Sequence, residues 1–184
     1  ICLIILTLFF LQNLSAEISW PTLQEGNKIF LIRHALAPGG GDPEGFKIND
    51  CSTQRNLDKT GIDQSKKIGK LFKKKFIPID EVLTSQWCRC RDTAKYAFKT
   101  YKEFSALNSV FQSPFIQNEE KQIREIREYI KNWKPKGKNL IMITHYSIIT
   151  KLTSSTPGSG EIVVIDKNFN ILETVPTIKM DFIY

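Results

Sequence analysis

The stretch KIFLIRH, residues 28–34, decides how this chain of 184 residues folds. Four consecutive apolar residues lead into an arginine and a histidine. A second stretch with the same plan, NLIMITH, covers residues 139–145. Short uninterrupted apolar runs are typical of strands buried on both faces of a parallel sheet. Ligands of α/β proteins bind beyond the carboxyl ends of such strands. We therefore expect His34 and His145, the two histidines of the chain, to face one site.

Helix-like and strand-like patterns alternate along the rest of the sequence. Thr60 is expected to cap the first helix, and Pro135 marks a stop before the second His-bearing run. The alternation predicts an α/β fold, namely a three-layer α/β/α sandwich with a mostly parallel central sheet and an antiparallel edge. The expected elements are strands over 28–33 and 81–84, helices over 60–75, 87–101 and 118–133, a strand over 139–144, a short helix containing Ile148, and a hairpin of 162–165 with 171–175. Residues 104–117 are ambiguous, although 104–110 could hold a short strand.

The first sixteen residues form a separate segment. Residues 1–11 are apolar and uncharged, which is too short for a membrane span of about 20 residues but typical of the core of a secretory signal. We expect residues 1–16 to be a signal peptide whose natural start lies upstream, and residues 17–184 to be one domain. The protein is then exported, periplasmic or secreted. An uncleaved N-terminal membrane anchor is the alternative.

The composition is that of a globular protein with an excess of positive charge. Hydrophobic residues make up 41% and charged residues 24%, and the net charge is +7. Many lysines fall between positions 66 and 75, where Ile68, Leu71, Phe72 and Phe76 are expected to face the core, so the lysines are expected to form a solvated face. No aromatic residues alternate with them, so we predict no nucleic-acid partner and favour an anionic substrate.

The cysteines leave room for one disulfide and predict no metal site. Loss of residues 1–16 leaves Cys51, Cys88 and Cys90, an odd number. Cys88 and Cys90 are too close in sequence for an easy mutual bridge, whereas Cys51 could pair with either of them. No cysteine or histidine spacing resembles a zinc site, so we expect no metal and no cofactor.

Three short motifs carry residues suited to phosphoryl chemistry. Arg33 and His34 combine a guanidinium that can bind two phosphate oxygens with an imidazole that can attack phosphorus. The segment LTSQWCRCRDTA, residues 83–94, places Arg89 on the first turn of a helix after a strand. Thr144 and His145 end the second run, at the same predicted edge of the sheet.

These motifs resemble the histidine phosphatase superfamily, also called phosphoglycerate mutase-like. Its pattern is Arg-His-Gly or Arg-His-Ala after the first strand, then Ser-Pro-Leu-x-Arg-Ala-x-Gln-Thr-Ala, and a late strand that ends in histidine. The matching segments here are RHA at 33–35, residues 85–94, and ITH at 143–145. The loop sequences RHALAPGGGDP and DCSTQRNL resemble a small exported bacterial branch of the superfamily.

The resemblance implies roles for individual residues. His34 would be the nucleophile, and Arg33, Arg89 and His145 would bind the phosphoryl oxygens. We expect the neighbouring arginines to keep the His34 imidazole neutral. Tyr146 stands where glycine is common in the family, and it could close the pocket or stack on substrate. Arg55 is expected to pair with a surface carboxylate rather than to bind substrate.

The general acid does not follow from the motifs. Glu161 is favoured because it lies between a loop and a strand, and Asp42, Glu119 and Glu120 are the other candidates. The sequence departs from the family pattern by carrying Gln86 and Trp87 in place of Pro-Leu.

The predicted function is a metal-independent phosphatase that forms a phosphohistidine intermediate. Its substrate would be a small phosphorylated molecule, an envelope sugar phosphate or a phosphoprotein. The alternatives are a phosphomutase of the same superfamily and a non-catalytic phosphate-binding module. Contact with a membrane is expected only if the N-terminal segment stays uncleaved.

Overall fold

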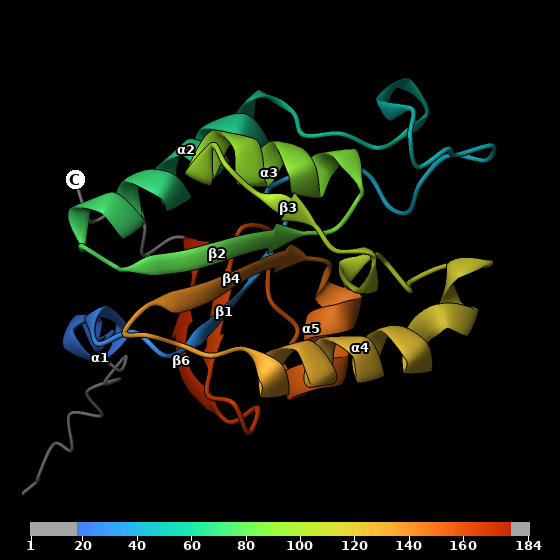
Figure 1. The fold of residues 1–184 in the computed structure, drawn as a ribbon. Coiled ribbons are helices and arrows are strands. Elements are labelled where there is room, and N and C mark those ends of the chain that lie inside the picture. Colours follow the sequence, from blue (N-terminus) through green and yellow to red (C-terminus); the bar gives the residue numbers. More distant parts are fainter. Residues whose placement is uncertain (1–17, 178–184) are drawn as a thin grey trace, which may run out of the picture.

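The computed structural model describes residues 18–177, which form a six-stranded sheet covered on both faces by helices (Figure 1). The strand order is β3-β2-β4-β1-β5-β6. Strands β1, β2, β3 and β4 run parallel to one another, and β5 and β6 pair antiparallel at one edge. The predicted α/β sandwich with an antiparallel edge is confirmed. The strands are β1 Ile29–Arg33, β2 Ile79–Thr84, β3 Lys102–Glu103, β4 Asn139–Thr144, β5 Ile162–Ile165 and β6 Ile171–Val175.

The helices pack on the two faces because strand side chains alternate between them. Phe30 and Ile32 of β1 face the layer that contains α2 and α3, whereas Ile29 and Leu31 face α4 and α5. Figure 1 shows α2 and α3 on one side of the sheet and α4 and α5 on the other. Continuous burial of β1 and β4 explains their uninterrupted apolar runs. The helices are α1 Trp20–Gln24, α2 Lys59–Lys74, α3 Cys88–Phe98, α4 Glu119–Asn132 and α5 Tyr146–Thr153.

Several predicted boundaries are wrong for local reasons. The Asp58 side chain, not Thr60, caps α2 by accepting a hydrogen bond from the Gly61 amide at 2.7 Å. Phe76 follows the end of α2 with φ of 50° and is 83% exposed instead of buried. The ambiguous segment that could have held a strand within 104–110 contains a 3₁₀ turn at Ser105–Leu107, preceded by β3. Helix α3 ends at Phe98, earlier than expected.

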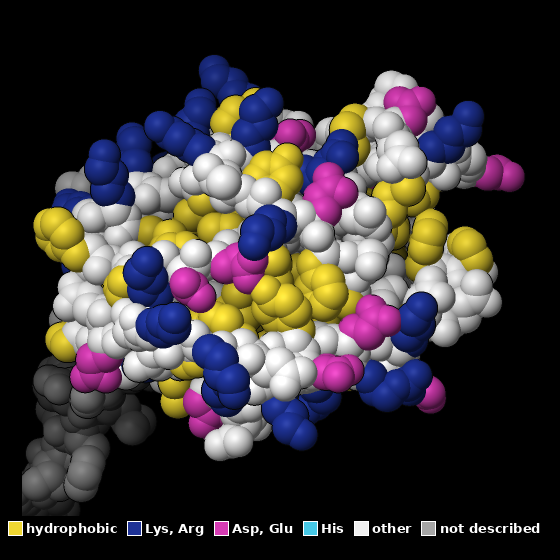
Figure 2. Space-filling model, viewed as in Figure 1, with side chains coloured by type: hydrophobic (Ala, Val, Ile, Leu, Met, Phe, Trp, Pro, Cys, Tyr) yellow, Lys and Arg dark blue, Asp and Glu magenta, His cyan; other side chains and the backbone are white. Residues whose placement is uncertain are grey.

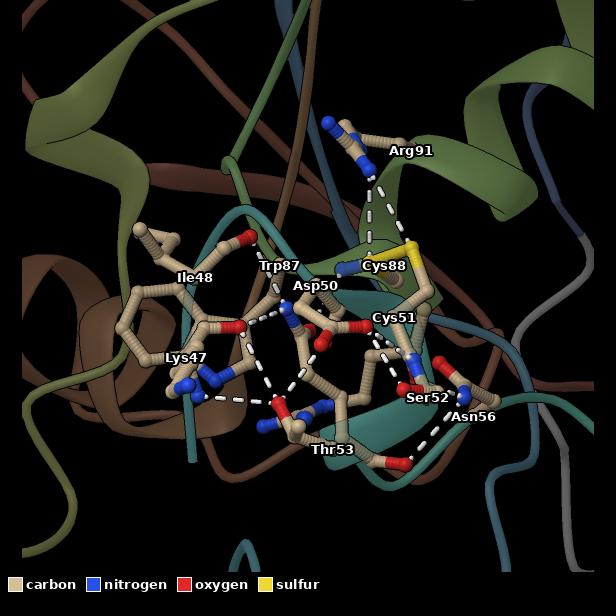
Figure 3. Close-up of a disulfide and its surroundings, with 12 residues drawn as sticks. Lys47, Ile48, Asp50, Cys51, Ser52, Thr53, Asn56, Trp87, Cys88 and Arg91 are labelled. Atoms are coloured by element: carbon tan, nitrogen blue, oxygen red, sulfur yellow. Dashed lines mark hydrogen bonds between the residues drawn. A yellow bond between two sulfur atoms is a disulfide. The ribbon is translucent and has the colours of Figure 1, made fainter. Parts of the chain in front are cut away.

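A disulfide connects the long loop after β1 to the start of α3. Cys51 is bonded to Cys88, with their Cα atoms 5.7 Å apart, whereas Cys90 is a free buried thiol. Figure 3 shows Arg91 beside the bond, donating to both sulfur atoms at 3.2 and 3.3 Å. Gln54 adds a second connection by accepting a hydrogen bond from the Cys88 amide at 2.9 Å. The loop is therefore held against the helix start next to Arg89.

Most lysines of α2 are exposed, as predicted. Ile68, Leu71 and Phe72 of this helix are buried against the sheet. Figure 2 shows dark-blue side chains gathered over the part of the molecule that α2 and α3 occupy in Figure 1. Within residues 18–177, no helix combines the length and apolar character needed to cross a membrane. The predicted signal peptide, residues 1–16, lies outside the described residues, so export stays a prediction.

Candidate active site

The carboxyl ends of three adjacent strands bring the predicted residues together. His34 follows β1, His145 follows β4 and Ser85 follows β2. The His34 amide donates to the Thr144 carbonyl, and the Ser85 amide donates to the Ile143 carbonyl, each at 2.9 Å. These backbone hydrogen bonds continue the sheet pairing past the strand ends and hold the three chain segments side by side.

His34 is oriented by its own neighbour in the chain. Its side chain is 2% exposed, and its Nδ1 lies 2.8 Å from the carbonyl oxygen of Ala35. A carbonyl only accepts hydrogen bonds, so Nδ1 carries the hydrogen and Nε2 keeps its lone pair. Burial, followed by the charge of Arg89, holds the pKa of His34 well below its usual value. The neutral imidazole predicted from the sequence is confirmed in direction, although burial contributes more than the arginines.

His145 lies against His34 from the neighbouring strand. The ring centroids are 5.3 Å apart and the rings meet edge to face. Its pKa is also well below the usual value, first because of burial and then because of Arg89 and His34. Arg89, the second residue of α3, comes within 3.5 Å of His145 Nδ1 through its Nη2. The structure thus gathers His34, His145 and Arg89 around one point.

A small cavity of about 120 Å³ lies at this point. It contains three arginines, two histidines and a single carboxylate among its lining residues, so its lining is strongly positive. Tyr146 lines it and packs under the Arg33 guanidinium, whose centre is 5.2 Å from the ring. The lining residues are Arg33, His34, Gly39, Gly40, Gly41, Asp42, Arg55, Arg89, Ser109, Phe111, Gln112, His145 and Tyr146.

The carboxylate is Asp42, which forms a two-point ion pair with Arg89. Its oxygens lie 2.7 and 3.1 Å from Nη1 and Nη2 of Arg89, and the Trp87 indole donates to Oδ2 at 2.9 Å. Burial acts to raise the pKa of Asp42, but these donors outweigh it and lower the pKa. Trp87 is itself buried, and it supports the site through Asp42 rather than by facing the cavity. Asp42 is therefore ionised at neutral pH.

The other acid candidates do not line the cavity. Glu161, which sequence reasoning favoured, directs Oε2 to the Gly158 amide at 2.6 Å, and its carbonyl accepts from the Arg33 amide at 3.1 Å. Glu119 is ion-paired with Lys151 at 2.9 Å. Glu120 belongs to α4, where its side chain is 90% exposed. The Glu161 carbonyl supports the Arg33 backbone. Its carboxylate acts on the site at a distance, because its negative charge raises the pKa of Arg33.

Arg55 lines the cavity, whereas the sequence predicted a surface ion pair. It donates to the carbonyls of Gly41 and Ala37, which fixes its guanidinium beside the site. Arg33 is held by the Pro157 carbonyl, which accepts from Nη1 at 2.9 Å. Burial lowers the pKa of both guanidinium groups without making them neutral at physiological pH.

Two guanidinium N–H groups at the site have no acceptor among residues 18–177. They are the Nε atoms of Arg33 and Arg89, and both are buried. A buried donor left unpaired costs about 1–3 kcal/mol, so an oxyanion that supplied acceptors here would be favoured. Ser109, Phe111 and Gln112 also line the cavity, but they lie in an irregular segment whose sequence carries no motif or periodicity.

Comparison with known proteins supports the fold. No family model matches the chain, and no curated protein matches it in sequence. The protein histidine phosphatase SixA, solved with tungstate, is similar in structure with TM-score 0.58 and 15% identity, over 83% of this chain and 99% of that one. TTHB049 of Thermus thermophilus has TM-score 0.57 and 12% identity, over 81% and 99%.

A third similar structure is an Escherichia coli K-12 protein described as a putative alpha-ribazole-5'-P phosphatase. It has TM-score 0.57 and 14% identity, over 76% of this chain and 90% of that one. The three structures match nearly the whole described fold at low sequence identity. Within this chain, the fold brings the motifs at 33–35, 85–94 and 143–145 to one edge of the sheet. The chain has the fold of the histidine phosphatase superfamily.

Proposed function

We propose that this chain is a phosphatase that transfers a phosphoryl group to Nε2 of His34 and then to water. The observation that carries the proposal is the tautomer of the neutral His34 ring. Its Nδ1 is bound to the Ala35 carbonyl, so the lone pair of a neutral ring remains on Nε2, in a cavity that three arginines line. A histidine needs this arrangement to act as a nucleophile near neutral pH.

The cavity suits a phosphoryl group in charge and size. Arg33, Arg55 and Arg89 supply three positive charges, and Asp42 supplies one negative charge. Phosphoryl transfer needs positioning and stabilisation of charge on the three non-bridging oxygens, and fixed guanidinium groups provide both. Tungstate, present in the similar SixA structure, is a tetrahedral oxyanion like phosphate, which supports the assignment of this cavity as an oxyanion site.

Asp42 adds a consequence for substrate binding. Because its carboxylate takes one N–H of Nη1 and one of Nη2 of Arg89, an incoming phosphoryl group either uses the remaining N–H groups, including the unpaired Nε, or displaces the carboxylate. Displacement would free two donors for the phosphoryl oxygens. The ion pair also holds Arg89 in place in the free enzyme.

The proposed substrates are phosphate monoesters or a phosphorylated protein. The leaving group would extend past Phe111, which is 53% exposed at the cavity wall, and Tyr146. The segments around the cavity form no separate cap domain within residues 18–177, which favours release of the dephosphorylated product over retention for a mutase reaction.

The test is hydrolysis of an aryl phosphate in the presence of a chelator, with His34→Ala as the matched variant. Turnover by the wild-type protein that is absent from the variant supports the proposal. Transfer of phosphate to an acceptor alcohol instead of water would identify the mutase. Binding of phosphate with no turnover of any tested monoester would identify a phosphate-binding module.

A further inference from the structure

His145 is connected to a chain of side-chain hydrogen bonds outside the cavity. The chain runs from the backbone of Gln86 through Asn108 and Ser85 to the Nε2 atom of His145. Ser85 is fully buried and follows β2, and Asn108 follows the 3₁₀ turn at Ser105–Leu107. None of the sequence motifs pointed to Asn108.

The amide of Asn108 has one possible orientation. Its oxygen accepts from the backbone amide of Gln86 at 2.9 Å, and its nitrogen donates to the side-chain oxygen of Gln86, also at 2.9 Å. A backbone N–H can only donate, so the atom facing it must be Oδ1. Oδ1 is then also the acceptor for the Ser85 hydroxyl at 3.1 Å.

The orientation of Ser85 fixes the tautomer of His145. The single hydroxyl hydrogen of Ser85 is directed at Asn108, and its oxygen accepts from the Trp87 amide at 3.2 Å. His145 Nε2 lies 3.0 Å from the same oxygen, so Nε2 carries a hydrogen and donates it. The lone pair of neutral His145 is therefore on Nδ1, the atom 3.5 Å from Arg89 Nη2.

The arginines around His145 oppose a proton on Nδ1 until an anion binds. Arg89 faces it from α3, Arg55 from the loop after β1 and Arg33 from the end of β1, where His34 also lies beside it. Asp42, paired with Arg89, is the one negative charge among the groups that line the cavity. Two further side chains lie beside His145. Tyr146 follows it in the chain, and the Cys90 thiol, whose pKa burial raises to about 12, lies 3.5 Å from Nε2.

A phosphoryl dianion offers only acceptors to this atom. Two lone pairs, one on Nδ1 and one on a phosphoryl oxygen, repel each other unless a proton lies between them. We propose, on the basis of the phosphatase function above, that the phosphoryl group binds together with one proton that resides at Nδ1 of His145. Ser85 and Asn108 are then positioning residues that set the required tautomer.

This proton balances both steps of the reaction. In the first step the bond from phosphorus to the leaving oxygen breaks, the bond to His34 Nε2 forms, and the proton leaves His145 with the alcohol product. In the second step water attacks phosphorus, the bond to Nε2 breaks, and one proton of the water returns to His145 Nδ1. This proton leaves His145 for the solvent when phosphate leaves the cavity. His145 therefore acts as the general acid. Among residues 18–177, the one carboxyl group that lines the cavity, Asp42, is ionised and cannot donate this proton.

The test is isothermal titration of the full chain with tungstate at about pH 8. Tungstate carries no proton there, so any proton taken up on binding comes from the buffer. Repeating the titration in buffers of different ionisation enthalpy gives the number of protons bound. We expect uptake of about one proton per tungstate in the wild-type protein.

Variants of the hydrogen-bond chain separate positioning from simple structural support. Ser85→Ala leaves His145 free to place its hydrogen on Nδ1, so tungstate should bind with uptake well below one proton. Asn108→Ala is expected to act in the same direction. Asn108→Asp keeps the acceptor for Ser85, so uptake should stay near one. Thermal melting of each variant verifies that it is folded.

Each outcome decides a different point. Tungstate binding by the wild-type protein without proton uptake would overturn the inference and leave the proposed function standing. Equal uptake in wild type and Ser85→Ala would overturn the role of the hydrogen-bond chain. A wild-type protein that binds no tungstate would overturn both the inference and the oxyanion site.

Discussion

The ends of β1 and β4 each deliver one histidine to the cavity, but they hold it in different ways. His34 and His145 are both 2% exposed, and burial followed by Arg89 lowers the pKa of both. His34 is bound to the carbonyl of the next residue, whereas His145 is bound to a side chain from another strand end. The Ala35 carbonyl leaves the lone pair of neutral His34 on Nε2, whereas the Ser85 hydroxyl, whose own hydrogen is directed at Asn108, leaves the lone pair of neutral His145 on Nδ1. The first arrangement suits a nucleophile and the second suits a proton carrier.

The largest predicted effect separates the two histidines. His34→Ala removes the atom that forms the covalent intermediate, so we expect turnover of an aryl phosphate to fall by about 10⁴-fold or more. His145→Ala removes a proton carrier and should lower turnover of the same aryl phosphate by about 10²–10⁴-fold. Steady-state kinetics on both variants measures the difference. A larger loss in His145→Ala than in His34→Ala would reverse the roles assigned here.

Arg89 contacts both regions, and its replacement is expected to have the next largest effect. Arg89→Lys keeps the charge beside Asp42 but loses the two parallel donors, so kcat/KM should fall about 10²-fold. The acid limb of the pH–rate profile should stay in place, because the positive charge near both histidines is retained. A loss smaller than about fivefold would show that Arg89 contributes charge alone.

The disulfide supports the loop that follows β1 and has no counterpart after β4 among residues 18–177. Replacing both Cys51 and Cys88 by Ser should lower the free energy of unfolding by about 2–4 kcal/mol. It should also raise KM more than it lowers kcat, because Asp42 and Arg55 lie on the released loop. Wild-type protein treated with a thiol reductant, which opens the bridge without any substitution, is the matched comparison for denaturant unfolding and kinetics. Unchanged KM in the double variant would show that the loop keeps its position without the bridge.

The two histidines should contribute alike to the pH dependence of stability. Their pKa is lower in the folded than in the unfolded chain, so the unfolded chain binds more protons as pH falls below about 6.5. Stability is full above that pH and decreases below it, by up to about 1.4 kcal/mol per pH unit for each histidine. Urea unfolding at about pH 7.5 and 5.5 measures the slope. His34→Gln and His145→Gln should each remove a similar part of the pH dependence of the free energy of unfolding. A pH dependence unchanged in both variants would contradict the buried neutral state of the two histidines.

The strands and the four motif residues were predictable because they depend on local patterns. Apolar runs identified β1 and β4, and the order of the motifs placed Arg33, His34, Arg89 and His145 at one edge. Asp42 and Arg55 could not be placed, because the loop after β1 is fixed by long-range contacts with Arg89, Trp87 and Cys88. Glu161 was favoured for its position in the chain, which does not reveal where a side chain points. The Ser85–Asn108 connection joins segments without a shared sequence pattern.

The most direct test of the account is to trap the covalent intermediate. The wild-type protein, mixed with a labelled aryl phosphate and quenched with alkali within one turnover, should carry one phosphoryl group on His34, identified by mass spectrometry of the peptide. His145→Ala should carry label on the same residue, formed more slowly. Label on any residue other than His34, or turnover by the wild-type protein with no labelled intermediate at any time, would contradict the central claim.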